Sequence, residues 1–216
     1  MSGFKVFNSA GAMTINSENK GTVASLYNPM PSLTDIGFYR IDSIFGNGST
    51  LGFLPPSFYP TNGGLRWFRL TVDGRYCFPG ASMFEPGTGD FMISSSAVGI
   101  QSGYLDVFDG GGNLVWSAVS AGSMPRIRSF LTIPPGHDLS SAITFNTSFD
   151  SPWICIGQCP GNLSDDGTAT GYSGIMIRRN SSTSYTLQYI NKNQLSYLSM
   201  MGSNQLQIAL ASFTGY

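Results

Sequence analysis

Short apolar and polar runs alternate along the chain, and one such pattern occurs in both halves. Residues 4–15, Phe-Lys-Val-Phe-Asn-Ser-Ala-Gly-Ala-Met-Thr-Ile, match residues 105–116, Leu-Asp-Val-Phe-Asp-Gly-Gly-Gly-Asn-Leu-Val-Trp, at a constant offset. In each copy a segment of alternating residues reaches an Asn or Asp suited to the start of a turn. A glycine then stands where a three-residue hairpin loop requires positive φ. Each copy therefore predicts a β-hairpin, and the pair indicates an internal duplication. The apolar positions expected on one face are Phe4, Val6, Met13 and Ile15, matched by Leu105, Val107, Leu114 and Trp116.

The remaining sequence also alternates with the period of two that β-strands require. Helical patterns of apolar residues at i, i+3, i+4 and i+7, free of Gly and Pro, are missing. The expected strands cover residues 22–27, 37–45, 65–72, 75–78, 91–94, 127–133, 142–147, 152–156, 174–179, 185–190 and 205–213. Asp73-Gly74, between two of these runs, is the strongest short-range hairpin signal. Short strands divided by Pro and Gly predict an all-β fold with little or no helix, an antiparallel β-sandwich or jelly roll.

The duplication also predicts how the chain divides. We expect two similar β-sandwich domains, residues 1–100 and 101–216, because a unit of this length can build its own core. The alternative is one single β domain over residues 1–216, in which two sheets each begin with the same hairpin.

The surface must be largely neutral, because Asp, Glu, Lys and Arg make up 11% of the chain, against about 25% in typical domains. The formal net charge is −1, so the chain lacks the basic field that gathers nucleic acid or anionic lipid. The first residues do not form the apolar segment of a signal peptide, and no apolar run is long enough to span a bilayer. We therefore expect cytoplasmic synthesis, no nucleic-acid binding and no membrane insertion.

Residues for catalysis or metal binding are poorly represented. The single histidine, His137, lies in a Pro-Gly turn, and no Gly-x-Ser-x-Gly elbow is present. Asp165 and Asp166 are neighbours in a loop and point apart, which suits paired glycosidase carboxylates poorly, so a hydrolase or lyase is only a third candidate. The three cysteines lack the spacing of a zinc site, and the acids are too few for a calcium loop. We expect structural thiols and no catalytic residue, metal or cofactor.

Aromatic side chains remain as candidate contact residues, because Phe, Trp and Tyr make up 13% of the chain. In loop-like sequence such rings can stack on sugars or anchor a protein interface. The candidates for interface or glycan contact are Phe53, Phe58, Tyr59, Tyr172 and Tyr216. Trp67, Trp116 and Trp153 lie within alternating strands and are expected in the core instead.

Residues 3–11, Gly-Phe-Lys-Val-Phe-Asn-Ser-Ala-Gly, resemble the opening of small virion proteins of tailed bacteriophages. Those proteins often begin Gly-aromatic-x-Val-aromatic-Asn/Asp-x-x-Gly. The second copy, residues 103–112, and the ending, residues 208–216, are similar to that group as well. The resemblance implies a structural protein of the virion tail, in a fibre, tip or baseplate, assembled in the host cytoplasm. It implies no catalytic residues.

The residues favour the same function independently of the resemblance. A neutral polar β surface with glycine-rich turns suits a rigid particle component whose affinity comes from repeated symmetric contacts. We therefore expect a protein without enzyme activity that assembles with other phage tail proteins and forms a homo-oligomer. The alternative is a carbohydrate-binding module that recognises host-surface glycan through loop aromatics such as Phe58 or Tyr59.

Overall fold

A computed structural model describes residues 3–7, 9, 11, 13–29, 38–44, 47–53 and 64–216. The first half contains β1 (Lys5–Phe7), β2 (Met13–Asn16), β3 (Val23–Pro29), β4 (Phe38–Ile44), β5 (Asn47–Phe53), β6 (Gly64–Leu70), β7 (Tyr76–Phe78), β8 (Met83–Phe84) and β9 (Gly89–Ser95). The second half contains β10 (Asp106–Phe108), β11 (Leu114–Ser117), β12 (Arg126–Ile133), β13 (Ile143–Asn146), β14 (Trp153–Cys155), β15 (Gly161–Asp165), β16 (Thr170–Arg179), β17 (Ser184–Lys192) and β18 (Leu206–Ser212). One short helix, α1 (Tyr197–Met201), and the 3-10 turns η3 (Pro79–Ala81), η4 (Ala121–Ser123) and η5 (Ile156–Gln158) complete the described elements. The predicted all-β class is confirmed.

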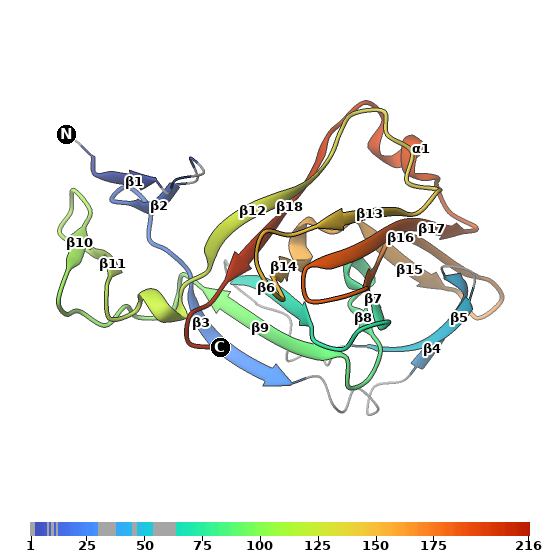
Figure 1. Cartoon of the computed structure of the whole chain (residues 1–216), viewed down its shortest axis with the longest axis horizontal. Helices are drawn as coiled ribbons and strands as arrows, with labels where there is room; N and C mark the ends of the chain where they lie inside the picture. The colour runs from blue at the N-terminus through green and yellow to red at the C-terminus, as the bar shows by residue number, and fades with distance from the viewer. Residues whose placement is uncertain are drawn as a thin grey trace.

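Two antiparallel sheets form the body of the molecule (Figure 1). The first sheet has the strand order β12-β18-β14-β6-β9-β3. The second has the order β13-β17-β16-β7-β8-β5-β4, with β15 added beside β16. The strands are short and every pairing among the described strands is antiparallel, which is typical of a β-sandwich.

Each sheet is assembled from two half-sheets that meet at its centre. In the first sheet, β3, β9 and β6 come from one half of the chain and β14, β18 and β12 from the other. Among the described residues only β6–β14 and β7–β16 join the halves, through pairs such as Phe68 with Ile154 and Cys77 with Ile177. In the first sheet both halves follow the same order from the edge to the centre. The edge strand is the one after a hairpin (β3 or β12), the next is the last strand of that half (β9 or β18), and the third is the central strand (β6 or β14). Apart from these two central pairings, the described strands of each half pair with one another.

The hydrophobic core, in contrast, is common to both halves. One cluster of buried side chains between the sheets combines residues of the first half with residues of the second. Its members include Phe68, Cys77, Phe84 and Phe91 together with Ile154, Ile177, Leu187 and Leu210. Side chains of both halves therefore pack in one core, while most strands pair within their own half.

Apolar side chains on the outer face of the first sheet form a second cluster. Strand alternation sends Phe68 inward and Trp67 outward, where Trp67 packs with Trp153 and Phe213. The Trp67 indole Nε1 donates a hydrogen bond to Ser94 Oγ at 2.9 Å, which satisfies its buried polar atom. Trp67 and Trp153 are buried as predicted, whereas Trp116 is only half-buried.

The Asp73-Gly74 segment is a tight turn, but the hairpin predicted there is wrong. It carries the chain from β6 in the first sheet to β7 in the second. The buried Arg179 holds this corner, because its Nε donates to Asp73 Oδ1 at 2.7 Å and its Nη1 to the Leu70 carbonyl at 2.6 Å. The Gly74 amide in turn donates to the Arg179 carbonyl at 2.8 Å. These contacts direct β7 toward β16 instead of back along β6.

Candidate functional site

The two predicted hairpins are present and lie beside the sandwich, not within it (Figure 1). We call the described residues of 3–22 and 102–120 the hairpin lobe. The register pairs Val6 with Ile15 and Val107 with Trp116, and each hairpin shifts register at the next step. The loop glycines Gly11 and Gly112 have φ of 76° and 80°, as the three-residue loop requires. The two copies therefore share one backbone conformation.

Contacts at the base of each hairpin are repeated too. Ser17 donates its amide to the Phe4 carbonyl at 3.0 Å, and Ala118 donates to the Leu105 carbonyl at 2.9 Å. Strand β2 lies against β11, and the amide of Gly21 donates to a carbonyl of β11 at 3.3 Å. The inward side chains of the two hairpins are half-buried by this arrangement.

Each hairpin also exposes apolar side chains. Phe7 is 57% exposed and its counterpart Phe108 is 51% exposed. Phe4 and Leu105, expected on the covered face, are more than half exposed as well, because each two-stranded hairpin lacks a second layer over these positions. We define the hairpin patch as Phe4, Phe7, Met13, Tyr104, Leu105, Phe108 and Val119. Nearly half of the exposed large hydrophobic side chains in the described part of the chain belong to it, and such a concentration indicates an interaction surface.

The aromatic candidates from the sequence are dispersed. Phe53 ends β5, and Phe58 and Tyr59 lie outside the described residues. Tyr172 is only 6% exposed, because its position on β16 places it in the cluster with Phe78 and Met176. The prediction of an exposed loop ring is therefore wrong for Tyr172.

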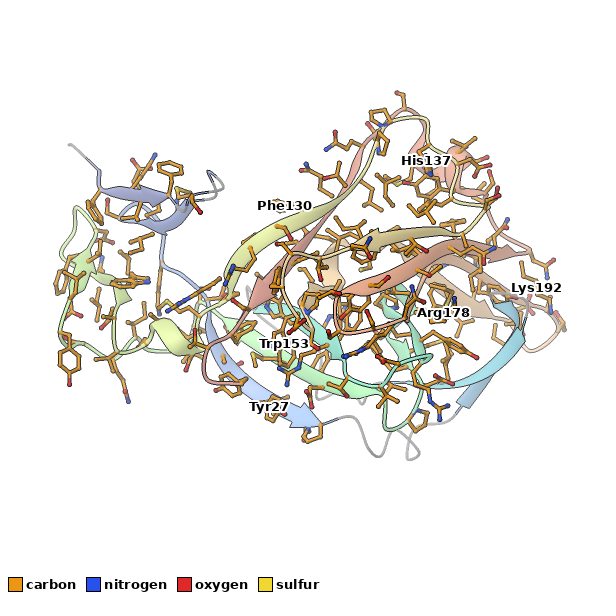
Figure 2. The ribbon with its side chains drawn as sticks, in the orientation of Figure 1. Tyr27, Phe130, His137, Trp153, Arg178 and Lys192 are labelled. Atoms are coloured by element: carbon orange, nitrogen blue, oxygen red, sulfur yellow. The ribbon has the colours of Figure 1, made fainter. Side chains whose placement is uncertain are left out.

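Tyr216 is exposed and belongs to an aromatic corner that also contains Tyr27 and Trp153. Figure 2 shows Tyr27 and Trp153 near one another. The Tyr216 and Tyr27 ring centroids are 5.4 Å apart, and the Tyr27 hydroxyl donates to Asp90 Oδ1 at 3.1 Å. Arg69 pairs with Asp90 through Nε at 3.0 Å, and its guanidinium carbon lies 4.6 Å from the Trp153 ring centroid. Partial burial, followed by the negative charge of Asp90, raises the pKa of Tyr27. The corner therefore exposes the rings of Tyr27 and Tyr216, while the neighbouring charged side chains, Arg69 and Asp90, pair with each other.

The polar residues considered for catalysis serve turns. His137 is half-buried in its turn, where its amide donates to the Pro134 carbonyl at 3.2 Å. Asp166 Oδ1 accepts from the amides of Thr168 and Ala169, and the hydrogen bonds of this loop lower the pKa of Asp166 to about 2. A carboxylate held ionised by its own loop does not have the raised pKa of a general acid. Among the described residues, no three His, Cys, Asp or Glu side chains are grouped to hold a metal ion.

The three cysteines are buried thiols without a disulfide. The pKa values of the Cys77 and Cys159 thiols are both raised, and burial is the largest cause in each case. Cys159 Sγ donates to the Cys155 carbonyl at 3.4 Å. A thiol kept protonated in an apolar site is a poor nucleophile, so these residues act as small core side chains.

Within the part of the chain that the structure describes, no helix has the length and apolar character needed to cross a bilayer. No curated protein and no solved structure matches the chain. One protein-family model, described as a domain of unknown function (DUF8377), matches residues 1–215. Since the match spans both hairpins and both sheets, the chain belongs to the DUF8377 family.

Proposed function

We propose that this chain is a structural protein that acts by protein–protein assembly, as a fibre, tip or baseplate component of a bacteriophage tail. The observation that carries the proposal is the hairpin patch, in which a duplicated element repeats its exposed apolar positions. In this function the sandwich is the rigid scaffold, and the hairpin lobe docks onto a neighbouring subunit. The resemblance of residues 3–11 to virion tail proteins supports the tail as the location.

Energetics favour covering the patch. Burying one large apolar side chain contributes about 1.5–3 kcal/mol. Phe7 and Phe108, at equivalent positions of the two hairpins, offer two similar apolar contacts to partners. Because β2 lies against β11, the two hairpins contact each other before binding, which lowers the ordering entropy that opposes the contact.

The experiment compares a patch variant with a matched surface control. Phe7→Ser with Phe108→Ser removes the equivalent rings, and Leu65→Ser with Val72→Ser removes apolar side chains of similar exposure from the sandwich. Light scattering after size exclusion measures self-association, and mass spectrometry of purified virions measures incorporation. We expect wild type and control to assemble and to appear in virions, and the patch variant to remain monomeric and absent.

A wild-type protein that stays monomeric and is missing from virions would refute the proposal. Normal assembly of the patch variant would refute the role of the hairpin lobe in particular. Circular dichroism of each variant confirms that the sandwich is folded before these results are compared.

Host-glycan recognition is a second candidate, favoured by the adjacent exposed rings of Tyr27 and Tyr216. Aromatic rings beside polar groups can stack on sugar faces. We expect signal on a glycan array that is lost with Tyr216→Ala and retained with Tyr104→Ala, a ring in the hairpin patch. An array without signal from the wild type would eliminate this candidate.

A further inference from the structure

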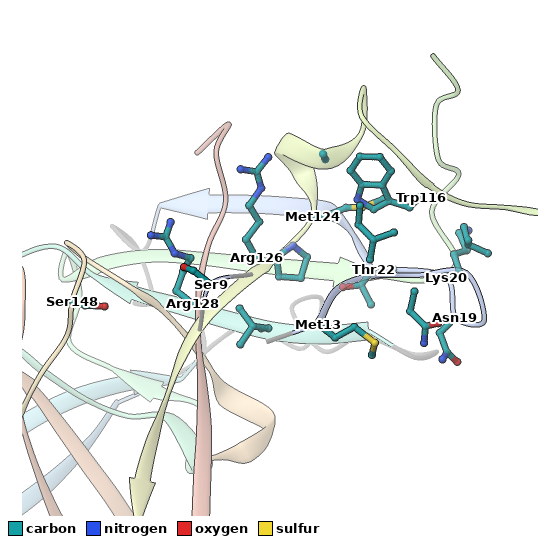
Figure 3. Close-up of a pocket in the computed structure, with 17 residues that line it drawn as sticks. Ser9, Met13, Asn19, Lys20, Thr22, Trp116, Met124, Arg126, Arg128 and Ser148 are labelled. Atoms are coloured by element: carbon teal, nitrogen blue, oxygen red, sulfur yellow. The ribbon is translucent and has the colours of Figure 1, made fainter. Parts of the chain in front are cut away.

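A groove of about 730 Å³ lies between the hairpin lobe and the strand β12 (Figure 3). Its apolar wall includes Met13, Ile15, Trp116 and Met124. The charged residues among the 17 that line it are Lys20, Arg126 and Arg128, and no Asp or Glu is among them. The groove therefore combines apolar surface with positive charge in a chain whose overall net charge is slightly negative.

Strand β12 is an edge of the first sheet, and the described strands leave one side of its backbone without a ladder partner. Seven of its eight residues pair with β18, its one partner among the described strands, and the register shifts at Arg128. In an antiparallel edge strand about half of the amides and carbonyls point away from the sheet, which makes the edge a template for a further strand. A second cavity of about 270 Å³ follows the same strand at Phe130 and Leu131, and Ser148 lines both cavities. The open space thus runs along β12.

The arginines of β12 differ from the others in the described part of the chain. Among the described residues the Arg126 guanidinium makes no ion pair or hydrogen bond, and the guanidinium of Arg128 lies over the Phe149 ring, 5.4 Å from its centroid. Arginines elsewhere have polar partners, as in the pairs Arg66 with Ser82, Arg69 with Asp90, Arg75 with Glu85, Arg178 with Asn180 and Arg179 with Asp73. Arg126 and Arg128 extend from alternate positions of the strand (Figure 3). Two guanidinium groups are therefore available beside an open edge.

We infer that β12 binds an extended acidic segment of a partner protein as an added β-strand. The backbone of the segment pairs with β12, and carboxylates at alternate positions meet Arg126 and Arg128. Apolar side chains of the segment then enter the groove against Met13 and Trp116. Basic residues on an edge also discourage unwanted pairing, so here they make pairing conditional on an acidic partner.

A second copy of this chain fits the edge less well. β12, with the sequence Arg-Ile-Arg-Ser-Phe-Leu-Thr-Ile, contains no Asp or Glu, so a second β12 strand would offer no carboxylate to Arg126 or Arg128. The opposite edge strand, β3, has the sequence Val-Ala-Ser-Leu-Tyr-Asn-Pro and offers no carboxylate. A small anion would use the guanidinium groups but neither the open backbone nor the second cavity. The inference goes beyond the proposed assembly function and does not depend on it.

The test uses the full chain and a fluorescein-labelled peptide, Ser-Asp-Val-Asp-Val-Thr-Val-Ser, with a control peptide in which Lys replaces Asp. We expect anisotropy to show binding of the acidic peptide only. Arg126→Glu with Arg128→Glu should weaken it by about tenfold or more, because a hydrogen bond to a charged group contributes about 1.5–3 kcal/mol. Arg126→Gln with Arg128→Gln provides a milder change, and Lys192→Glu, at the exposed end of β17, controls for charge. Hydrogen exchange of residues 126–133 should slow when the peptide binds.

Several results would overturn the inference. Equal binding of the Lys peptide, unchanged binding by both arginine variants, or protection of β3 instead of β12 would each do so. Complete displacement by inorganic phosphate, at an ionic strength where sodium chloride has no effect, would indicate an anion pocket instead. The Phe7→Ser, Phe108→Ser variant should bind the peptide like wild type, which distinguishes this result from failure of the proposed function.

Discussion

The joint between the two halves brings backbone against backbone at glycines, and Gly161→Ala tests how closely they fit. Gly161 begins β15 and faces Gly80 of η3. A Cβ added to Gly161 would lie 2.7 Å from the Gly80 Cα and 2.8 Å from the Gly80 carbonyl carbon. These atoms are backbone and cannot rotate away, so the halves must separate slightly to admit the methyl group.

The expected loss follows from two opposing effects. Overpacking costs up to about 3 kcal/mol, and alanine recovers about 0.4–1 kcal/mol by restricting the unfolded chain. The net destabilisation of Gly161→Ala is then about 2 kcal/mol. For a chain of this size each kcal/mol lowers Tm by about 2–4 °C, so the melting temperature should fall by about 4–8 °C.

Calorimetry of wild type, Gly161→Ala and Gly157→Ala measures this effect. Gly157 lies in η5, where an added Cβ meets nothing within 4 Å, so the control should be unchanged or slightly more stable. If the melting temperature of Gly161→Ala equals that of Gly157→Ala and is not below that of wild type, the backbones of Gly161 and Gly80 do not make the close contact that joins the halves.

Three further predictions concern single groups. Arg179→Met should destabilise the fold by about 1–3 kcal/mol in urea unfolding, because it removes the buried guanidinium that pairs with the exposed Asp73 and leaves the Leu70 carbonyl without its donor; a loss under about 0.5 kcal/mol would contradict this. Carbon-13 titration of the Asp166 carboxyl should give a midpoint near pH 2, because hydrogen bonds from its loop lower its pKa to about 2, and a midpoint near 3.8 would contradict this. The ionised carboxylate stabilises the loop at pH values above 3.8, and this contribution is lost as the pH falls toward 2. Cys77 and Cys159 should react with a thiol reagent only after unfolding, and stability should fall as pH rises above 9, because their raised pKa values favour the protonated fold until the unfolded thiols ionise; rapid labelling of the native protein would contradict burial.

Local sequence patterns were sufficient for much of the strand content. The hairpin repeat predicted both two-stranded ribbons and their positive-φ glycines, and alternation placed Trp67 and Trp153 in buried positions. Strands without alternation were missed, as in β5, Asn-Gly-Ser-Thr-Leu-Gly-Phe, and β15, Gly-Asn-Leu-Ser-Asp. Such polar, glycine-containing segments become strands because a neighbouring strand supplies hydrogen bonds, which their own residues do not indicate.

The candidate surfaces depend on long-range arrangement to a greater extent. Alternation indicates which side chains share a face, but not whether another layer covers that face, so Phe7 and Phe108 became candidates only when the hairpins were found outside the sandwich. The open edge at Arg126 and Arg128 follows from the order of strands in the sheet. By itself, the sequence determined the all-β class, the duplicated hairpins and the period of each strand, because these depend on neighbouring residues. The joining of two halves into one sandwich, the burial of Tyr172 and the turn between sheets at Asp73 were decided by tertiary structure, because they depend on contacts between residues far apart in the chain.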